Sequence, residues 1–294
     1  RVVVVPGTGS SIFAGQGFVA DTSGDLFGSI TEAKRLQYVT MGEGGADKAG
    51  GSRSAAWLFL EGAMEDAKTF PRPYASGDMG DSLSRVDAEA LRDMVRGDQV
   101  MLISVSRASD ILEVIKFKEA NDRLNIVLVG ADEGWMVARQ LAEADIPVIV
   151  DPFQNLPASF EKLGATGENA SRLIAADVKT AFAHLGDDGH QARLVLQSAG
   201  NAVANGVPYQ AALAAVTSVP AEIFGLEDLG KLEPGKVADI VLWDGDPLEV
   251  MSAPAAIYID GEEQSLTSRQ TELRDRYLGI STAKKPPAYL PETP

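Results

Sequence analysis

Apolar runs alternate with helical patterns across the middle of this chain, and this alternation constrains the fold more than any other feature. Three short aliphatic runs without polar alternation are predicted as buried strands. Between them, apolar residues recur every three or four positions, which is typical of helices. The strands are residues 99–104, 125–129 and 147–150, and the helices are residues 108–120 and 133–144. Strands separated by helices predict right-handed βαβ units around a parallel sheet.

The flanking segments extend this pattern. Residues 2–5 form a β-branched run that ends at PGTGS, so we expect another buried strand, a glycine-rich loop and a short strand at 18–20. Ser52 is placed to cap a helix over residues 53–70. The remaining expected elements are helices at 87–96, 169–176, 191–204 and 209–216, a loop at 71–82 and a strand at 178–183. About five or six parallel strands result, fewer than a closed (β/α)₈ barrel requires, and we expect the missing strands to precede Arg1.

After Glu222 the apolar period changes to two. Residues 238–243 and 256–259 are predicted strands, followed by a charged helix at 266–277 and a proline-rich tail. We therefore divide the chain into an incomplete α/β barrel (1–225), a small β appendage (226–264) and a helix with its tail (265–294). Strands near Ala238 and Ala256 should expose an unpaired edge unless another chain or a preceding segment supplies partners.

Charge narrows the range of partners. The 42 acidic residues outnumber the 26 basic ones, and the net charge of -16 argues against binding nucleic-acid phosphates. A neutral or cationic small-molecule ligand is easier to accommodate. No apolar run approaches the roughly 18 residues of a membrane span. An acidic chain without cysteine slightly favours the periplasm over the cytoplasm.

Four ordered motifs carry a resemblance to a known family. They are VVPGTGSSIFAGQGFVAD (4–21), SVSRASDI (104–111), IVLVGADEGWMVARQLAEADIPVIVDP (126–152) and LGKLEPGKVADIVLWDGDPLE (229–249). Together they resemble the imidazolonepropionase-like members of the amidohydrolase superfamily. The resemblance implies a distorted (β/α)₈ TIM-like barrel, a β-sandwich made from both chain termini, and a metal site at the carboxyl ends of the strands that hydrolyses carbon-nitrogen bonds.

The same resemblance indicates that the metal site is degenerate. The family's lysine position falls on Asp21, its two later histidines fall on Ser104 and near Gly130, and its aspartate falls near Leu185. The family's HxH pair would lie before Arg1. Zinc is held by imidazole, thiolate or carboxylate groups, and serine, glycine and leucine do not replace them.

Other polar residues at predicted strand ends are candidates for a pocket. Ser106 and Arg107 follow one strand, and Arg107 could clamp a carboxylate, although an ion pair with Asp110 or Glu133 is an equal alternative. Glu133 follows the next strand. A later loop contains a group of ionisable residues that suits either an ordinary turn or a relocated metal site: His184, Asp187, Asp188 and His190.

Two functions follow. The first is a barrel of amidohydrolase descent that has lost its metal-binding histidines and binds a small molecule or a peptide fragment without catalysis, or serves as a partner subunit. The alternative is a zinc-dependent hydrolase of carbon-nitrogen bonds that combines ligands before Arg1 with Asp21, Asp187, Asp188 and one histidine. No cofactor is expected for the first function, and an oligomer, or association with a segment that precedes Arg1, is compatible with both.

Overall fold

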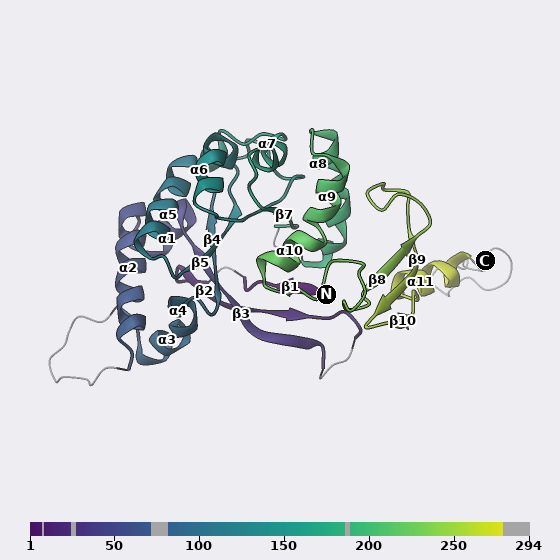
Figure 1. Ribbon diagram of the computed structural model, residues 1–294, viewed down its shortest axis with the longest axis horizontal. Helices are drawn as coiled ribbons and strands as arrows, with labels where there is room; N and C mark the ends of the chain where they lie inside the picture. The colour runs from purple at the N-terminus through teal and green to yellow at the C-terminus, as the bar shows by residue number, and fades with distance from the viewer. Residues whose placement is uncertain (8, 25–27, 72–81, 186–188, 279–294) are drawn as a thin grey trace, which may run out of the picture.

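A curled seven-stranded sheet forms the centre of the computed structural model, which describes all residues except 8, 25–27, 72–81, 186–188 and 279–294 (Figure 1). The strands follow one another in sequence order, β1 and β2 antiparallel and β3 to β7 parallel. Their bounds are β1 (Val2–Val4), β2 (Phe13–Ala20), β3 (Ile30–Thr40), β4 (Val100–Val105), β5 (Asn125–Gly130), β6 (Val148–Val150) and β7 (Thr180–Phe182). The predicted parallel α/β sheet is confirmed, and it has the form of a half-barrel.

The register brings the carboxyl ends of the parallel strands to one level. Thr40 at the end of β3 pairs with Ser104 in β4, Val105 pairs with Gly130 in β5, and Val150 pairs with Phe182. Neighbouring strands lie about 4.8 Å apart. The loops that follow β3 to β7 therefore share one rim, which we call the carboxyl edge.

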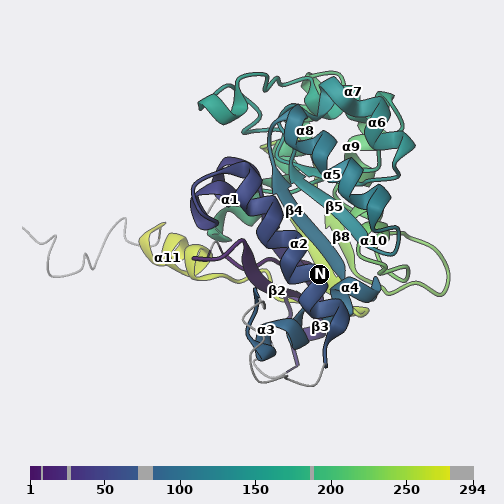
Figure 2. The same ribbon diagram turned by 90° about the vertical axis from the view of Figure 1, so that its left-hand side faces the viewer.

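Helices cover both faces of this sheet. Figures 1 and 2 show α1, α2 and α5 on one side of the strands and α10 on the other. On the first side, Leu60 and Met64 of α2 join a large core with Ile103 of β4. On the second, Ile223 and Phe224 cover the strand residues that face them. The helices are α1 (Gly42–Lys48), α2 (Arg53–Thr69), α3 (Arg85–Ala90), α4 (Arg92–Arg96), α5 (Ala108–Ala120), η1 (Gly134–Val137), α6 (Ala138–Glu143), η2 (Phe160–Lys162), α7 (Asn169–Ala175), η3 (Gly189–Leu194), α8 (Val195–Ala204), α9 (Tyr209–Ala215) and α10 (Ser218–Ile223).

Local sequence explains the longest helix. Ser52 accepts a hydrogen bond on its hydroxyl from the amide of Ala55 at 3.1 Å, which confirms the predicted cap of α2. At the other end, Pro71 disfavours helical geometry at Phe70, whose backbone is extended.

One prediction at the start of the sheet was wrong, and one strand was not predicted. The run at residues 2–5 is not a buried parallel strand, because β1 pairs antiparallel with β2, and Val2 and Val4 are 40% and 36% exposed. The β-branched residues there satisfy strand propensity at a sheet edge rather than core burial. The structure also contains β3 (Ile30–Thr40), which was not predicted from the sequence and is the first parallel strand.

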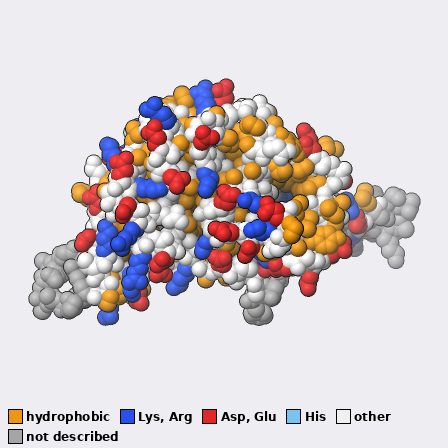
Figure 3. Space-filling model, viewed as in Figure 1, with side chains coloured by type: hydrophobic (Ala, Val, Ile, Leu, Met, Phe, Trp, Pro, Cys, Tyr) orange, Lys and Arg blue, Asp and Glu red, His pale blue; other side chains and the backbone are white. Residues whose placement is uncertain are grey.

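A small antiparallel sheet follows the half-barrel. It contains β8 (Ile240–Trp243), β9 (Pro254–Ile259) and β10 (Glu262–Gln264), with β9 in the centre, and α11 (Arg269–Leu278) comes after it. Ala256 therefore lies in a strand with two neighbours, while β8 is at the edge. Figure 3 shows hydrophobic side chains gathered toward this side of the molecule, and Val241 and Leu242 of β8 are 43% and 51% exposed. The boundaries at 225 and 264 stay predictions.

Among the described residues, we found no helix with both the length and the apolar composition needed to cross a membrane.

Candidate carboxyl-edge site

Buried polar atoms gather at the carboxyl edge, where parallel barrels place their chemistry. Several buried side-chain atoms of the described residues lack hydrogen-bond partners, and four of them lie at this edge: Thr40 Oγ1, Asp132 Oδ2, Asn155 Oδ1 and His184 Nε2. Thr40 is the last residue of β3, and the other three come from the loops after β5, β6 and β7. An unsatisfied buried polar group costs roughly 1–3 kcal/mol. Atoms of this kind along one rim favour a site for water or a polar ligand.

Asp151 organises one end of the edge. It follows β6 directly and is 6% exposed. Its carboxylate accepts hydrogen bonds from the amides of Phe153 at 3.0 Å and Leu185 at 3.2 Å. His184 Nδ1 lies 3.5 Å from its Oδ2. The pair orients the imidazole, so that Nε2 is the nitrogen left for another partner.

Asp132 forms a second polar position after β5. Its side chain is 7% exposed, and Lys162 Nζ lies 3.2 Å from Oδ1. A buried carboxylate is stabilised by a cation at this distance. Its Oδ2 has no partner in the part of the chain that the structure describes, so this pair can still accept a hydrogen bond from a ligand.

Glu133 is committed to the fold. Its carboxylate accepts hydrogen bonds from the amide of Ala108 at 3.0 Å, in the first turn of α5, and from the amide of Gly164 at 2.9 Å. Its own amide donates to the carbonyl of Ser106 at 2.9 Å. A carboxylate at a helix N-terminus is favoured by the helix dipole. Glu133 and Ser106 therefore tie the loops after β4 and β5 together.

Arg107 pairs with neither acid that the sequence suggested. Its Nη2 donates to the carbonyl of Phe160 at 2.9 Å, and its Nε lies 3.7 Å from Glu161 Oε2. Asp110 instead accepts two hydrogen bonds from Arg53 Nε, at 3.1 and 3.2 Å, and Arg53 Nη2 also donates to Glu161. Burial raises the pKa of Asp110, against the opposing effect of the Arg53 guanidinium. This ion cluster fastens the loop after β6 onto the starts of α2 and α5.

Ser104 and Gly130 occupy positions where the resemblance places histidines, and the backbone is unusual at Gly130. The carbonyl of Ser104 accepts a hydrogen bond from the amide of Met41 at 3.0 Å. Gly130 has φ of +87°, and the buried Ala131 that follows has φ of +43°. A Cβ at Gly130 would lie 3.2 Å from the carbonyl oxygen of Val105. A histidine at position 130 would be strained, because its Cβ disfavours this left-handed backbone conformation.

Asp21 lies elsewhere. It follows β2, which runs against β3, so it stands at the amino ends of the parallel strands. Hydrogen bonds from Ser23 lower the pKa of Asp21, and its Oδ2 lies 3.4 Å from Arg1 Nη1. Arg1 also pairs with Asp260 at 2.7 Å, in the turn between β9 and β10. Asp21 thus helps to attach the small sheet and does not reach the carboxyl edge.

Three further candidates are not placed. Asp187 and Asp188 lie outside the described residues, as does the side chain of His190. Within the described part, no group of three or more His, Cys, Asp or Glu side chains is placed to hold a metal ion. The residues carried over as ligands do not fit zinc, because a serine hydroxyl and a glycine offer no charged or imidazole donor.

The sequence reading missed Asp132 and Asp151. Asp151 follows the run PVIV directly, and Asp132 stands two residues after the strand that ends at Gly130. Acids immediately after parallel strands are expected at a barrel's functional edge. That rule would have found both residues.

Comparisons with known proteins agree with this fold. Residues 82–268 match the profile of the amidohydrolase family. A 60-residue stretch is 53% identical to amidohydrolase tasK of Hapsidospora irregularis, a stretch that covers 20% of this chain and 6% of that protein. An amidohydrolase of Thermotoga maritima MSB8 has a similar structure, with a TM-score of 0.77 and 24% identity over 91% of this chain and 71% of that one.

Proposed function

Because this chain belongs to the amidohydrolase family, we propose that it is a non-catalytic barrel of that family which binds a polar small molecule or a peptide fragment at the carboxyl edge. The observation that carries the proposal is the row of buried polar atoms on that rim without partners in the described part, at Thr40, Asp132, Asn155 and His184. A ligand with both donors and acceptors would satisfy them.

The replaced ligand positions support a role without catalysis. At Gly130 the change involves the backbone as well as the side chain, since its left-handed conformation disfavours any L-residue. The neighbouring acids are partly engaged, Asp132 with Lys162 and Asp151 with His184. These contacts suit recognition of a ligand that stays intact.

Binding can be tested by thermal unfolding of the 294-residue chain in the presence of dipeptides, cyclic amides and other polar amides. A ligand at a hundred times its Kd adds about 2.7 kcal/mol to the free energy of unfolding. Asp132→Asn should remove most of that shift, and Asp122→Asn, a change of an exposed acid on another face, should leave it intact. Mass spectrometry should recover the ligand unchanged. A shift that is equal in both variants would contradict the carboxyl-edge site.

The alternative function is a metal-dependent hydrolase of carbon-nitrogen bonds, and it is favoured by His184 Nε2, which has no hydrogen-bond partner among the described residues. Elemental analysis for zinc, manganese, nickel and iron, followed by hydrolysis assays on the same amides, separates the two functions. Stoichiometric metal together with turnover that His184→Ala abolishes would establish the hydrolase. Intact ligands that bind in the presence of added zinc would support the binding role.

A further inference from the structure

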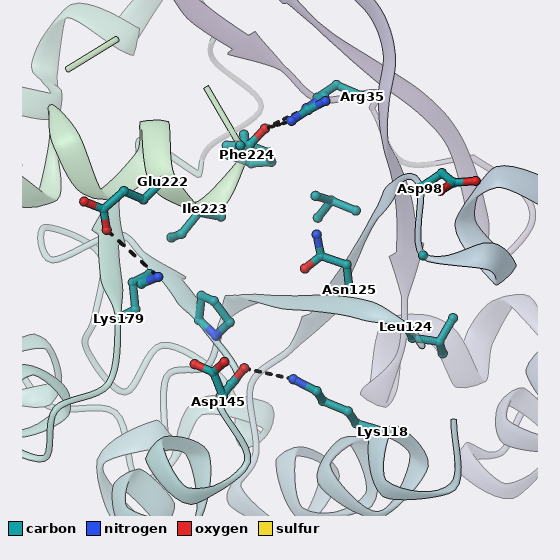
Figure 4. A pocket seen from close by; sticks show the side chains of 14 residues that line it. Arg35, Asp98, Lys118, Leu124, Asn125, Asp145, Lys179, Glu222, Ile223 and Phe224 are labelled. Carbon is teal, nitrogen blue, oxygen red and sulfur yellow. Dashed lines mark hydrogen bonds and ion pairs between the residues drawn. The ribbon is translucent and has the colours of Figure 1, made fainter. Parts of the chain in front are cut away.

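A cavity of about 360 Å³ lies at the opposite end of the parallel strands, where they begin (Figure 4). Its walls come from the starts of β4 to β7 and from the segment at the end of α10, with Val100, Leu124, Pro147 and Phe224 as apolar surfaces. Small-molecule pockets usually fall between roughly 300 and 1,000 Å³. The carboxyl-edge function makes no use of this end.

Two of the cationic residues that line this cavity are less exposed than its acids. Arg35 and Lys118 are half-buried. Lys118 Nζ donates to the carbonyl of Asp145 at 2.9 Å, and among the described contacts this is the hydrogen bond that holds it. Burial lowers the pKa of Lys118, against the opposing effect of the nearby Asp145 carboxylate. Asn125, which is exposed, also lines the cavity and adds an amide donor and acceptor.

The acids of the cavity lie on its exposed rim. Asp98, Asp145 and Glu222 line the opening and are all exposed. Glu222 is shared between Lys179, at 3.9 Å, and Lys231, at 3.2 Å. Water and salt screen exposed charges more strongly than half-buried ones. The half-buried cations therefore favour an anionic group, and the exposed acids favour a cationic one.

We propose that this cavity binds a free amino acid or a short peptide, with the carboxylate against Lys118 and Asn125 and the ammonium group toward the acids of the rim. A simple anion would be repelled by the net charge of -16, whereas a zwitterion carries no net charge into that field. A half-buried lysine and exposed acids in one cavity match the two ends of an amino acid.

Isothermal titration calorimetry of the full chain tests this with three probe types: the standard amino acids and glycylglycine, succinate as an anion without an ammonium group, and 1,4-diaminobutane as a dication. At least one amino acid or glycylglycine should bind, and more tightly than both of the other probes. Absence of binding for every zwitterion, or succinate binding equally well, would overturn the proposal.

A matched pair of variants on α5 locates the site. Lys118→Met should weaken zwitterion binding by about tenfold, which corresponds to about 1.4 kcal/mol for a lost charge-assisted contact. Lys116→Met changes a lysine on the same helix that pairs with Glu113 and is 67% exposed, and it should leave affinity unchanged. Should Lys118→Met not fold, Asn125→Ala gives the same test. Equal affinity in the cavity variant and the Lys116→Met control would overturn the proposal, and unchanged affinity in Asp132→Asn separates this site from the carboxyl edge.

Discussion

Gly130→Ala tests whether the backbone conformation at the end of β5 disfavours a residue with a side chain. Gly130 has φ of +87°, and an added Cβ would lie 3.2 Å from the carbonyl oxygen of Val105. A left-handed conformation costs an L-residue about 1–2 kcal/mol. The close contact requires a further small adjustment of buried backbone. We expect a total loss of about 2 kcal/mol in the free energy of unfolding.

This loss can be converted into a melting temperature. An unfolding entropy of about 2.1 cal/mol/K per residue gives about 0.6 kcal/mol/K for a chain of 294 residues. A loss of about 2 kcal/mol should therefore lower Tm by about 3 °C. Thermal unfolding followed by circular dichroism, with urea titration as a second measurement, resolves a shift of this size.

Two other glycines separate the cost of the left-handed conformation from the cost of the close contact with Val105. Gly235 also has φ of +87° but has no heavy atom within 4 Å of an added Cβ, so Gly235→Ala measures the conformational cost alone. Gly7 has equally open surroundings and a φ outside the left-handed region, so Gly7→Ala should stay within about 0.5 kcal/mol of the native chain. The expected order of loss is Gly130, then Gly235, then Gly7. Equal stability of the Gly130 and Gly7 variants would refute the reasoning.

Three shorter predictions concern the supports of the carboxyl edge. Glu133→Gln turns one acceptor into a donor that faces an amide of Ala108 or Gly164, and should cost about 1–3 kcal/mol in urea unfolding; a loss below about 0.5 kcal/mol would contradict the capping role. Burial raises the pKa of Asp110 above 3.8, so protonation of Asp110 favours the folded state. Relative to Asp110→Asn, the native chain should therefore gain stability in urea unfolding as pH falls from 7 toward 3.8. A relative loss of stability over this range would contradict the raised pKa. Ser52→Ala should cost about 1 kcal/mol through the lost cap of α2, checked by urea unfolding, and no change would show that the helix end is held by packing alone.

The parallel strands β4, β5 and β6 were predictable because the local sequence pattern of each is typical of a buried strand. Residues 99–104, 125–129 and 147–150 are aliphatic and bounded by helical patterns, and they became β4, β5 and β6 with shifts of one residue. Strand β3 was not predictable by the same rule. Its sequence ITEAKRLQYVT mixes charged and apolar residues, and its first half is largely exposed. It forms a strand because it pairs with β2 on one side and with β4 on the other, and β4 is distant in the sequence.

The location of these candidate residues was predictable, but their contacts were not. The sequence pattern placed Ser104, Gly130 and Glu133 at the carboxyl ends of parallel strands, where the structure has them. It did not predict that Arg107 would pair with Glu161, because Glu161 comes from the loop after β6 and reaches the start of α5 only in the folded chain. Asp21 was misplaced for a related reason: without β3, the direction of β2 could not be known, and direction decides which end of the sheet a residue occupies.

The family signal and the metal site depend on different kinds of residue, which explains how one can persist without the other. The motif LEPGKVADIVLW contains a left-handed turn at Gly235 and the apolar strand β8, which pairs with β9. Ser104 shows the opposite case: its carbonyl accepts a hydrogen bond from Met41, a contact that any side chain at that position would allow. A substitution at position 104 therefore removes a metal donor and leaves the strand intact. Gly130 goes further, since its conformation opposes the return of a histidine. If the conformational cost measured with Gly235→Ala is also found at Gly130, restoring both histidines should destabilise the fold before it rebuilds a metal site.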